Sequence, residues 1–292
     1  MVSRAIYAII VYLFIIMEDY CFLNGKIVPF SQARLRLDDL GVLRGYGVFD
    51  YLRTYGGKPI LLSKNLARLR RSAEKLGLAI KYSDALLTEA VLTLIAKNGH
   101  KESSIRIVLT GGPSQDAMTP GEPTLYILVS EFTALPTKLY QLGVKLITHN
   151  YLRLVPEAKT LNYITAIKLL PQKKAAGAFE ILYVYEGKIL ECTTSNFYIF
   201  KGNTLVTAKQ DILSGVTREI VLELARNHFT VEERDISVSQ LSEASESFIT
   251  AANKKILPVI AIDDWKIATG KVGKNTQKLM KLFDEFVQAN QK

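Results

Sequence analysis

Three segments in the second half of the chain carry residues whose types could support carbonyl chemistry. Lys159 lies in "EAKTLNYI", Glu191 lies in "ILECTTSNFYIF", and Gly215 comes directly before the expected helix start "VTREIVLELARNH". A lysine amine can form a Schiff base with a carbonyl group and later move a proton. The apolar residues around Glu191 indicate burial, and a buried carboxylate needs a cationic partner. Helix N–H groups that follow a glycine can bind an anion.

These parts correspond to the requirements of a pyridoxal phosphate site. Such a site needs a lysine for the Schiff base and a carboxylate against the pyridine nitrogen. Its phosphate needs N–H groups at a helix N-terminus, hydroxyl groups and an arginine. Each residue also has a plainer interpretation. Among 37 Lys and Arg residues, a lysine in a turn is usually solvated, and Thr217 could serve only as a helix N-cap.

From Tyr20 to nearly the C-terminus, the chain resembles the class IV, or fold type IV, pyridoxal-phosphate transaminases. This family includes D-amino acid transaminases, branched-chain aminotransferases and aminodeoxychorismate lyases. The segments that carry the resemblance occur in the family's order: "LARLRRSAEKL", "KTLNYITA", "GKILECTTSNFYIF", "ILSGVTRE" and "SFITAANKKILPVIAID". The resemblance implies an enzyme with pyridoxal 5'-phosphate as cofactor and amino and keto acids as substrates. It also implies a homodimer with a shared active site.

The resemblance assigns a role to each matched residue. Lys159 matches the Schiff-base lysine, and Glu191 matches the carboxylate that faces the pyridine nitrogen. Tyr163 resembles the tyrosine that contacts the ring oxygen in branched-chain enzymes, but it is one residue nearer the lysine, so its role stays open. The other expected cofactor contacts are Arg68, Ser195, Leu213, Val216, Thr217 and Thr250.

The residues that would hold the substrate depart from both familiar patterns. The loop "GGPSQDAMTP" lacks the Arg-x-His pair of D-amino acid enzymes, and Ser104 replaces the tyrosine of branched-chain enzymes. Arg106 lies in an apolar strand, where an unpaired guanidinium is costly. Arg44 lies in "LRGYGVFD", a segment that the family usually contributes across the dimer interface. We expect both arginines to hold carboxylates of an acidic partner, unless Arg106 pairs with a nearby acid. Phe49 and Ala251 are the other expected substrate contacts.

The sequence therefore predicts a transaminase that moves an amino group between a D-amino acid and 2-oxoglutarate or pyruvate, closest to an atypical D-amino acid transaminase. The alternatives are an L-branched-chain-amino-acid aminotransferase and then an aminodeoxychorismate lyase, which shares the "TTSN" segment and the lysine-to-"LN" spacing. A basic, non-enzymatic binding module is the alternative from another class, because the net charge is +9. The cations are spread along the chain without interleaved aromatic residues, so nucleic-acid binding is not expected.

Composition excludes several other classes. Cys21 and Cys192 are the only cysteines and lie far apart, so neither a disulfide scaffold nor a cysteine-rich zinc site is expected, and a reducing cytoplasm fits best. No dinucleotide or P-loop glycine motif occurs. The apolar run from Ala5 to Ile16 is shorter than the roughly 20 residues that span a bilayer. We interpret residues 1–16 as an upstream extension, with Met17 as the true start.

Antiparallel hairpins mixed with helices indicate an α+β fold with two domains. We expect a smaller N-terminal α/β domain over residues 17–133, a connector over 134–142 and a larger C-terminal domain over 143–292. The resemblance implies that the C-terminal domain is a pseudo-barrel that binds the cofactor. The local signals predict hairpins at Asn24-Gly25, Gly56-Gly57 and Glu186-Gly187, a helix capped by Ser63, and one helix from the Lys159 segment to about Ala176.

Overall fold

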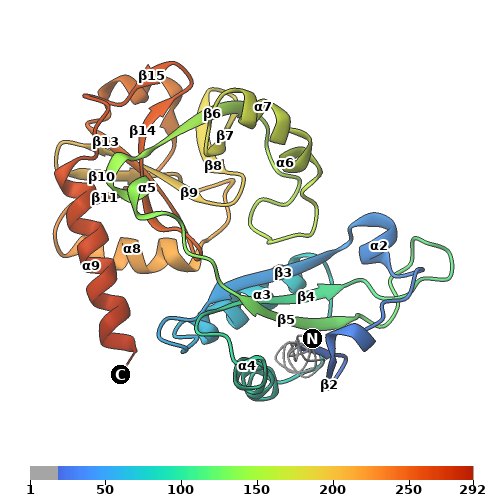
Figure 1. The fold of residues 1–292 in the computed structure, drawn as a ribbon. Coiled ribbons are helices and arrows are strands. Elements are labelled where there is room, and N and C mark those ends of the chain that lie inside the picture. Colours follow the sequence, from blue (N-terminus) through green and yellow to red (C-terminus); the bar gives the residue numbers. More distant parts are fainter. Residues whose placement is uncertain (1–18, 292) are drawn as a thin grey trace, which may run out of the picture.

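Two sheets, each with its own hydrophobic core, form the protein (Figure 1). The computed structural model describes residues 19–291, so the expected extension over residues 1–16 and the expected start at Met17 lie outside the described part. The predicted two-domain α+β fold is confirmed. The proposed connector, residues 134–142, lies between the last strand of the first sheet and the first strand of the second.

The first sheet is antiparallel and has the strand order β2-β1-β5-β4-β3. Side chains on alternate positions of its strands pack against two helices, because successive residues of a strand point to opposite faces. Leu66 and Leu94 of these helices contact the same core as Leu52 and Ile107 of the sheet. The elements are β1 (Tyr20–Leu23), β2 (Lys26–Pro29), α2 (Leu40–Arg44), β3 (Gly47–Arg53), α3 (Leu62–Lys75), α4 (Asp84–Asn98), β4 (Ser103–Thr110) and β5 (Leu125–Glu131).

The second sheet closes on itself. Six of its strands pair in the ring β9-β13-β14-β6-β7-β8, and β8 pairs back to β9 through Glu191 and Asn196. Closure removes free strand edges and encloses a core that includes Leu182, Phe197 and Ile249. The predicted pseudo-barrel is thus confirmed. Its strands are β6 (Val144–Asn150), β7 (Glu180–Tyr185), β8 (Lys188–Cys192), β9 (Asn196–Lys201), β13 (Glu246–Ala251) and β14 (Lys255–Ile262), with β10 (Thr204–Thr207), β11 (Thr230–Glu233), β12 (Ile236–Ser237) and β15 (Trp265–Lys266) attached.

Helices cover the outside of the barrel. Helices α8 (Val216–Arg226) and α9 (Lys274–Asn290) pack on β9, β10 and β13 through a third apolar cluster that contains Phe248 and Phe283. Three short helices lie elsewhere in this half of the chain: α5 (Thr137–Leu142), α6 (Ile164–Lys168) and α7 (Leu170–Ala175). An ion pair of 2.5 Å between Lys64 of α3 and Glu219 of α8 joins the two halves.

The predicted hairpins at Asn24-Gly25 and Glu186-Gly187 are confirmed, and all four turn residues have positive φ angles. The hairpin predicted at Gly56-Gly57 is shorter than expected. The turn is closed by a single bridge between Tyr55 and Lys58, and no second strand continues after it in the described chain. Pro59, which lacks a backbone N–H group, accepts a turn hydrogen bond from Leu62 instead, and a helix begins there.

Two helix predictions also need correction. Helix α3 begins at Leu62, so Ser63 lies inside the first turn and does not cap it. The single helix expected up to Ala176 is divided at Leu169 into α6 and α7. Pro171 explains the division, because proline is tolerated in the first turn of a helix and breaks a helix interior.

Candidate active site

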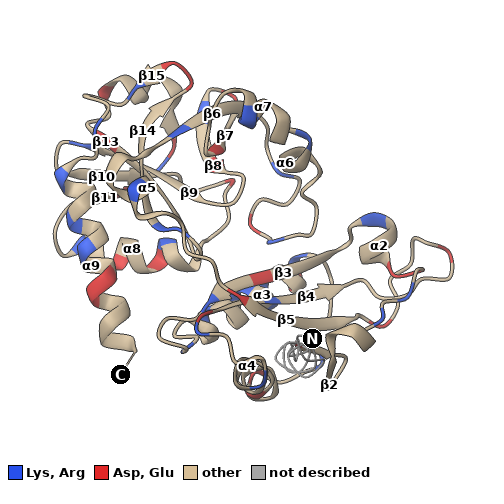
Figure 2. Cartoon of the chain, in the orientation of Figure 1, with Lys and Arg blue, Asp and Glu red and all other residues tan. Residues whose placement is uncertain are grey.

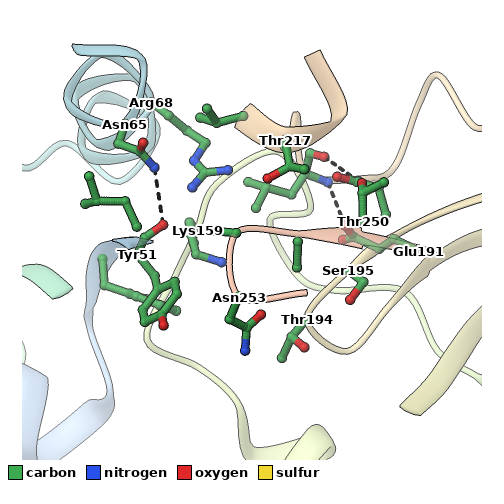
Figure 3. A pocket seen from close by; sticks show the side chains of 18 of the residues that line it. Tyr51, Asn65, Arg68, Lys159, Glu191, Thr194, Ser195, Thr217, Thr250 and Asn253 are labelled. Atoms are coloured by element: carbon green, nitrogen blue, oxygen red, sulfur yellow. Dashed lines mark hydrogen bonds between the residues drawn. The ribbon is translucent and has the colours of Figure 1, made fainter. Parts of the chain in front are cut away.

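A cavity of about 350 Å³ lies between the barrel and the first sheet (Figure 3). Side chains from both domains line it, so the chain must fold completely before the cavity exists. It contains all but one of the predicted site residues: Phe49, Arg68, Arg106, Lys159, Glu191, Ser195, Leu213, Val216, Thr217, Thr250 and Ala251.

The Lys159 segment belongs to the C-terminal half, but the N-terminal domain holds it. The N–H group of Phe49 donates to the Lys159 carbonyl at 2.9 Å, and that of Leu161 donates to the Gly47 carbonyl at 2.9 Å. The Lys159 N–H group donates to Ser72 Oγ on α3 at 3.1 Å. A Cβ atom at Gly47 would lie 2.5 Å from the Leu109 carbonyl oxygen and 2.7 Å from Leu161 Cδ1. Glycine therefore permits the Lys159 segment to pack closely against β3. These bonds fix the lysine at the domain boundary.

The Lys159 side chain points into the cavity, with Nζ 4.6 Å from the centre of the Phe49 ring. Burial lowers the pKa of Lys159 to about 7, and the positive charge of Arg68 acts in the same direction. Nearby Asp50 and Glu191 oppose this shift without cancelling it. A large fraction of the amine is therefore uncharged near neutral pH, which is the form that attacks a carbonyl carbon.

Glu191 is buried beside the cavity, with 5% of its surface exposed. Its Oε1 accepts from Arg153 Nε at 2.8 Å, and its Oε2 accepts from the Leu213 N–H group at 3.0 Å. Burial raises the pKa of Glu191, and the Arg153 charge opposes that rise. Arg153 also donates to the carbonyls of Ala158 and Pro156, next to Lys159. Arg153 therefore connects the glutamate to the lysine segment, and no sequence signal indicated it.

Arg68 reaches the cavity from α3 and is held by a buried carboxylate. Its Nε and Nη2 donate to the two oxygens of Asp50 at 2.8 Å each, and Asn65 donates to the same carboxylate at 2.7 Å. Asp50 points to the helix-covered face of β3, where it is fully buried. Within residues 19–291, Nη1 of Arg68 has no hydrogen-bond partner, so this nitrogen is available to an anion.

The first turn of α8 supplies N–H donors on the same side of the cavity as Arg68 (Figure 3). Gly215 is its N-cap, with extended backbone, and no side chain of the described chain caps the helix. A Cβ atom at Gly215 would lie 2.1 Å from Asn196 Oδ1, so glycine permits the close approach of this side-chain amide. Thr217 lies inside the first turn, so its interpretation as an N-cap is wrong. The N–H groups of Val216 and Thr217 can instead bind a phosphate.

Two further hydroxyl groups line the cavity but differ in availability. Thr250 Oγ1 lies 3.1 Å from the Tyr198 hydroxyl and forms one hydrogen bond there. Ser195 donates to Glu180 at 2.8 Å and accepts from Lys254 at 3.0 Å, so its proton is already committed. An amine, a buried carboxylate and a phosphate-binding end with Arg68, Thr250 and the α8 N-terminus thus surround one cavity, an arrangement that fits pyridoxal phosphate.

The substrate side of the cavity is formed by alternate residues of β3 and by β4. Phe49, Tyr51 and Arg53 share one face of β3, and Arg106 of β4 lies opposite Tyr51 in the register. Tyr51 and Ser104 share a hydrogen bond of 3.0 Å between their hydroxyl groups. Arg106 lines the cavity and is exposed, and in the described part of the chain no acid pairs with it, so the alternative of an internal ion pair is wrong.

Arg44 is the predicted residue that one chain does not bring to its own cavity. It is exposed on α2 and makes only a hydrogen bond to the neighbouring Leu43 carbonyl. Arg53 occupies the cavity wall instead, with its guanidinium 3.6 Å from the Phe132 ring centre and 4.4 Å from that of Tyr55. Sequence reasoning missed Arg53, although its two-residue spacing from Tyr51 could have indicated it.

Tyr163 lines the cavity despite its shorter spacing from the lysine. Its ring meets that of Phe49 edge-on at 5.7 Å, and burial raises its pKa to about 12. Over residues 19–291 there is no cluster of side chains suited to a metal ion. No helix in that range is both long and apolar enough to cross a bilayer.

Comparison with known proteins shows which family the chain resembles. The family model for class IV aminotransferases matches residues 47–262. A D-alanine aminotransferase of Bacillus licheniformis is 30% identical over 88% of this chain and 93% of its own length. A Methanocaldococcus jannaschii protein, provisionally named a branched-chain-amino-acid aminotransferase, is 32% identical over 90% of this chain and 95% of its own.

Solved structures agree on the fold. The branched-chain amino acid aminotransferase of Escherichia coli superimposes with a TM-score of 0.87 at 23% identity, covering 94% of this chain and 96% of that one. The branched-chain aminotransferase of Thermoproteus uzoniensis, solved with norvaline, gives 0.85 at 26% identity, covering 94% and 96%. A further branched-chain enzyme, solved with pyridoxamine 5'-phosphate, gives 0.86 at 24% identity, covering 94% and 95%. This chain therefore shares the fold of these enzymes.

The lowered pKa of Lys159 predicts how the apoprotein binds pyridoxal phosphate at different pH values. Only the uncharged amine reacts with the aldehyde, so the binding rate should rise up to a pH of about 7 and then level off. Stopped-flow absorbance of the developing yellow colour measures this rate. A rate that keeps rising toward pH 10, as for an ordinary lysine with a pKa of about 10.4, would contradict the prediction. Lys159→Met, the control, should form no lysine-bound chromophore.

Proposed function

The chain belongs to the class IV aminotransferases, and we propose that it moves an amino group between a D-amino acid and a 2-oxo acid, either 2-oxoglutarate or pyruvate. It is a pyridoxal-phosphate-dependent enzyme. The observation that carries the proposal is one cavity lined by Lys159, Glu191 and the α8 N-terminus, with two arginines, Arg53 and Arg106, that pair with no acid of the described chain.

Each residue of the cavity has a separate task in this reaction. When bound, pyridoxal phosphate supplies an aldehyde for the lysine and a ring that accepts electrons. Lys159 Nζ would hold that aldehyde and, as a free amine, would accept the proton from the substrate α-carbon. Glu191 would face the ring nitrogen, and Arg153 keeps this carboxylate in place. Arg68 and the N–H groups of Val216 and Thr217 bind the phosphate.

Two guanidinium groups on the substrate side favour an acidic partner. Arg106 and Arg53 lie on neighbouring strands of the same sheet face, and no carboxylate of the described chain neutralises either one. Guanidinium groups bind carboxylates bidentately, so a dicarboxylic acid such as 2-oxoglutarate satisfies both. Preference for D-amino acids is supported by Ser104, in place of the branched-chain tyrosine, and by the D-alanine aminotransferases among the relatives.

An L-branched-chain-amino-acid aminotransferase is the second candidate. The provisional name of the Methanocaldococcus jannaschii relative and the names of the superimposed structures favour it. A basic binding module has less support. Figure 2 shows lysine and arginine spread over both domains and mixed with acidic residues. Because Cys21 and Cys192 are buried free thiols in separate sheets, a cytoplasmic location is part of the proposal.

A panel of amino donors distinguishes the two candidates. The yellow absorbance of the holoenzyme should disappear at least about tenfold faster with D-glutamate and D-alanine than with L-leucine or L-glutamate. This ratio corresponds to a difference of about 1.4 kcal/mol in transition-state stabilisation. The rate of absorbance change in single-turnover reactions measures it. Faster conversion of L-leucine would reverse the preference in favour of the branched-chain reaction.

Arg106 provides a second test of the acidic partner. Arg106→Met should lower kcat/KM for 2-oxoglutarate by about 10- to 100-fold, since a hydrogen bond to a charged group contributes about 1.5–3 kcal/mol. Its effect with pyruvate, which lacks the second carboxylate, should be smaller. Arg70→Met is the control, because Arg70 pairs with Asp84 at the surface, outside the cavity. Equal losses with both acceptors would remove Arg106 from the binding of the second carboxylate.

We also propose a homodimer in which Arg44 reaches the partner's cavity. Large apolar side chains remain exposed around α2 and around α6 and α7, which lie on the same side of the molecule in Figure 1. Exposed apolar surface on this scale is typical of an interface between chains. These residues are Phe30, Leu35, Leu37, Val42, Leu43, Leu154, Ile164, Ile167 and Leu170.

Mixing two inactive chains tests the shared site. Lys159→Met lacks the lysine, and Arg44→Met lacks the arginine proposed to act in the partner. A heterodimer of the two contains one site with both residues, so it should recover about half of the wild-type activity for acidic substrates by symmetry. Differently tagged, co-expressed chains purified by both tags supply the heterodimer. No recovery would place Arg44 outside the partner's site.

A further inference from the structure

Two segments that are far apart in the sequence form one wall of the cavity. Residues 193–196 comprise the loop between β8 and β9 and the first residue of β9, and residues 251–254 comprise the last residue of β13 and the turn to β14. They lie at the same end of neighbouring strands, since Thr250 pairs with Asn196. Figure 3 shows Thr194 and Asn253 near each other at the side of the cavity below Lys159.

A buried ion pair joins these two segments. Lys254 Nζ lies 3.2 Å from Glu180 Oε2 and donates to Thr194 Oγ1 at 2.6 Å and Ser195 Oγ at 3.0 Å. The side chains of Lys254 and Glu180 are only 7% and 4% exposed. The Lys254 ammonium group therefore contacts the Glu180 carboxylate and the hydroxyl groups of residues 194 and 195, and it is almost completely shielded from solvent.

Glu180 completes the connection from β7. Its carboxylate accepts from the hydroxyl groups of Thr193 at 2.9 Å, Thr194 at 2.7 Å and Ser195 at 2.8 Å, and also from the Thr194 N–H group. Burial acts to raise the pKa of Glu180, but the Lys254 charge and these hydrogen bonds lower it overall. The side chains of Thr193, Thr194 and Ser195 thus all donate hydrogen bonds to one carboxylate, and the charge of Lys254 neutralises that carboxylate.

The backbone of Lys254 is also fixed from the other direction. Its N–H group donates to the Ala251 carbonyl at 3.0 Å, and its carbonyl accepts from the Tyr140 hydroxyl of α5 at 3.0 Å. Asn253, the preceding residue, is exposed and lines this cavity and two neighbouring ones. Moving Lys254 would therefore displace Asn253 and Ala251 together.

We propose that Lys254 and Glu180 are positioning residues, which fix the turn at Ala251–Lys254 to the loop at Thr193–Asn196 and so set the width of the cleft that receives the substrate. The proposal concerns the substrate of the function proposed above and rests on it. Contacts outside the pair hold the lysine and the proposed phosphate-binding arginine: Ser72 holds Lys159, and Asp50 holds Arg68. Loss of the pair should therefore affect substrate binding more than the attachment of the cofactor.

Lys254→Met in the full-length holoenzyme tests the proposal by two measurements. The KM for the amino donor should rise at least about tenfold, because a cleft of altered width loses binding that the substrate makes equally in the ground state and the transition state. The kcat should change less than threefold, roughly, and the absorbance spectrum of the bound cofactor should persist. Hydrogen exchange measured by mass spectrometry should accelerate in residues 193–196 and 251–254. Lys254→Arg, which keeps the charge, should restore much of both properties.

Lys255→Met is the matched control, because Lys255 is the next residue but pairs with the exposed Asp284 at 2.7 Å, outside this cavity. It should change neither KM nor exchange. The double variant Glu180→Gln with Lys254→Met guards against misfolding, since it leaves no unpaired buried charge. It should still show the raised KM and the faster exchange.

The outcomes separate this inference from the proposed function. Unchanged exchange in both Lys254→Met and the double variant overturns the inference, whatever the activity. A wild-type KM in the double variant also overturns it, because the pair would then contribute only to stability. If the wild-type holoenzyme converts no amino acid, the proposed function fails, while the exchange measurement still decides whether the pair fixes the two segments.

Discussion

The site depends on burying one lysine amine so that its charged form is much less favoured than in water. The Lys159 amine lies buried against the Phe49 ring. Burial and the charge of Arg68 together lower its pKa to about 7. A charged amine in the same place would bring two cations together away from bulk water. Asp50 neutralises Arg68, and Arg153 neutralises Glu191, so each of these charges near the lysine has its own partner. The amine is the group left to react.

This arrangement requires both domains. The barrel presents Glu191 and the start of α8, while the first sheet and α3 supply Arg68 and the hydrogen bonds that fix the Lys159 backbone. Because the lysine segment pairs with the beginning of β3, a change in the relative position of the domains would move the amine with the smaller one. Preorganised geometry of this kind lets binding energy act on the reacting atoms.

The sequence predicts which residues line the site better than it predicts the hydrogen-bond and ion-pair partners that hold those residues in place. Local chemistry was sufficient for the Asn24-Gly25 turn and for the α8 start after Gly215, where backbone conformation depends on neighbouring residues. Motif resemblance supplied Lys159 and Glu191. The partners Asp50, Arg153 and Glu180 were missed, because each meets its counterpart only after distant strands and helices have packed. Arg44 shows a different limit, since it lies outside the cavity of its own chain and the contacts of one chain give it no role.

The alternation along β3 has a consequence for how such enzymes diversify. Phe49, Tyr51 and Arg53 project from one strand toward the substrate, while the intervening Asp50 and Leu52 belong to the buried face. Substitutions at the odd-numbered positions can therefore alter the shape and charge offered to a substrate without repacking the core. Apart from Arg68, the residues proposed to hold the cofactor come from the C-terminal half of the chain. A lineage with this architecture can acquire new substrates through changes in a single strand while its chemical machinery is inherited intact.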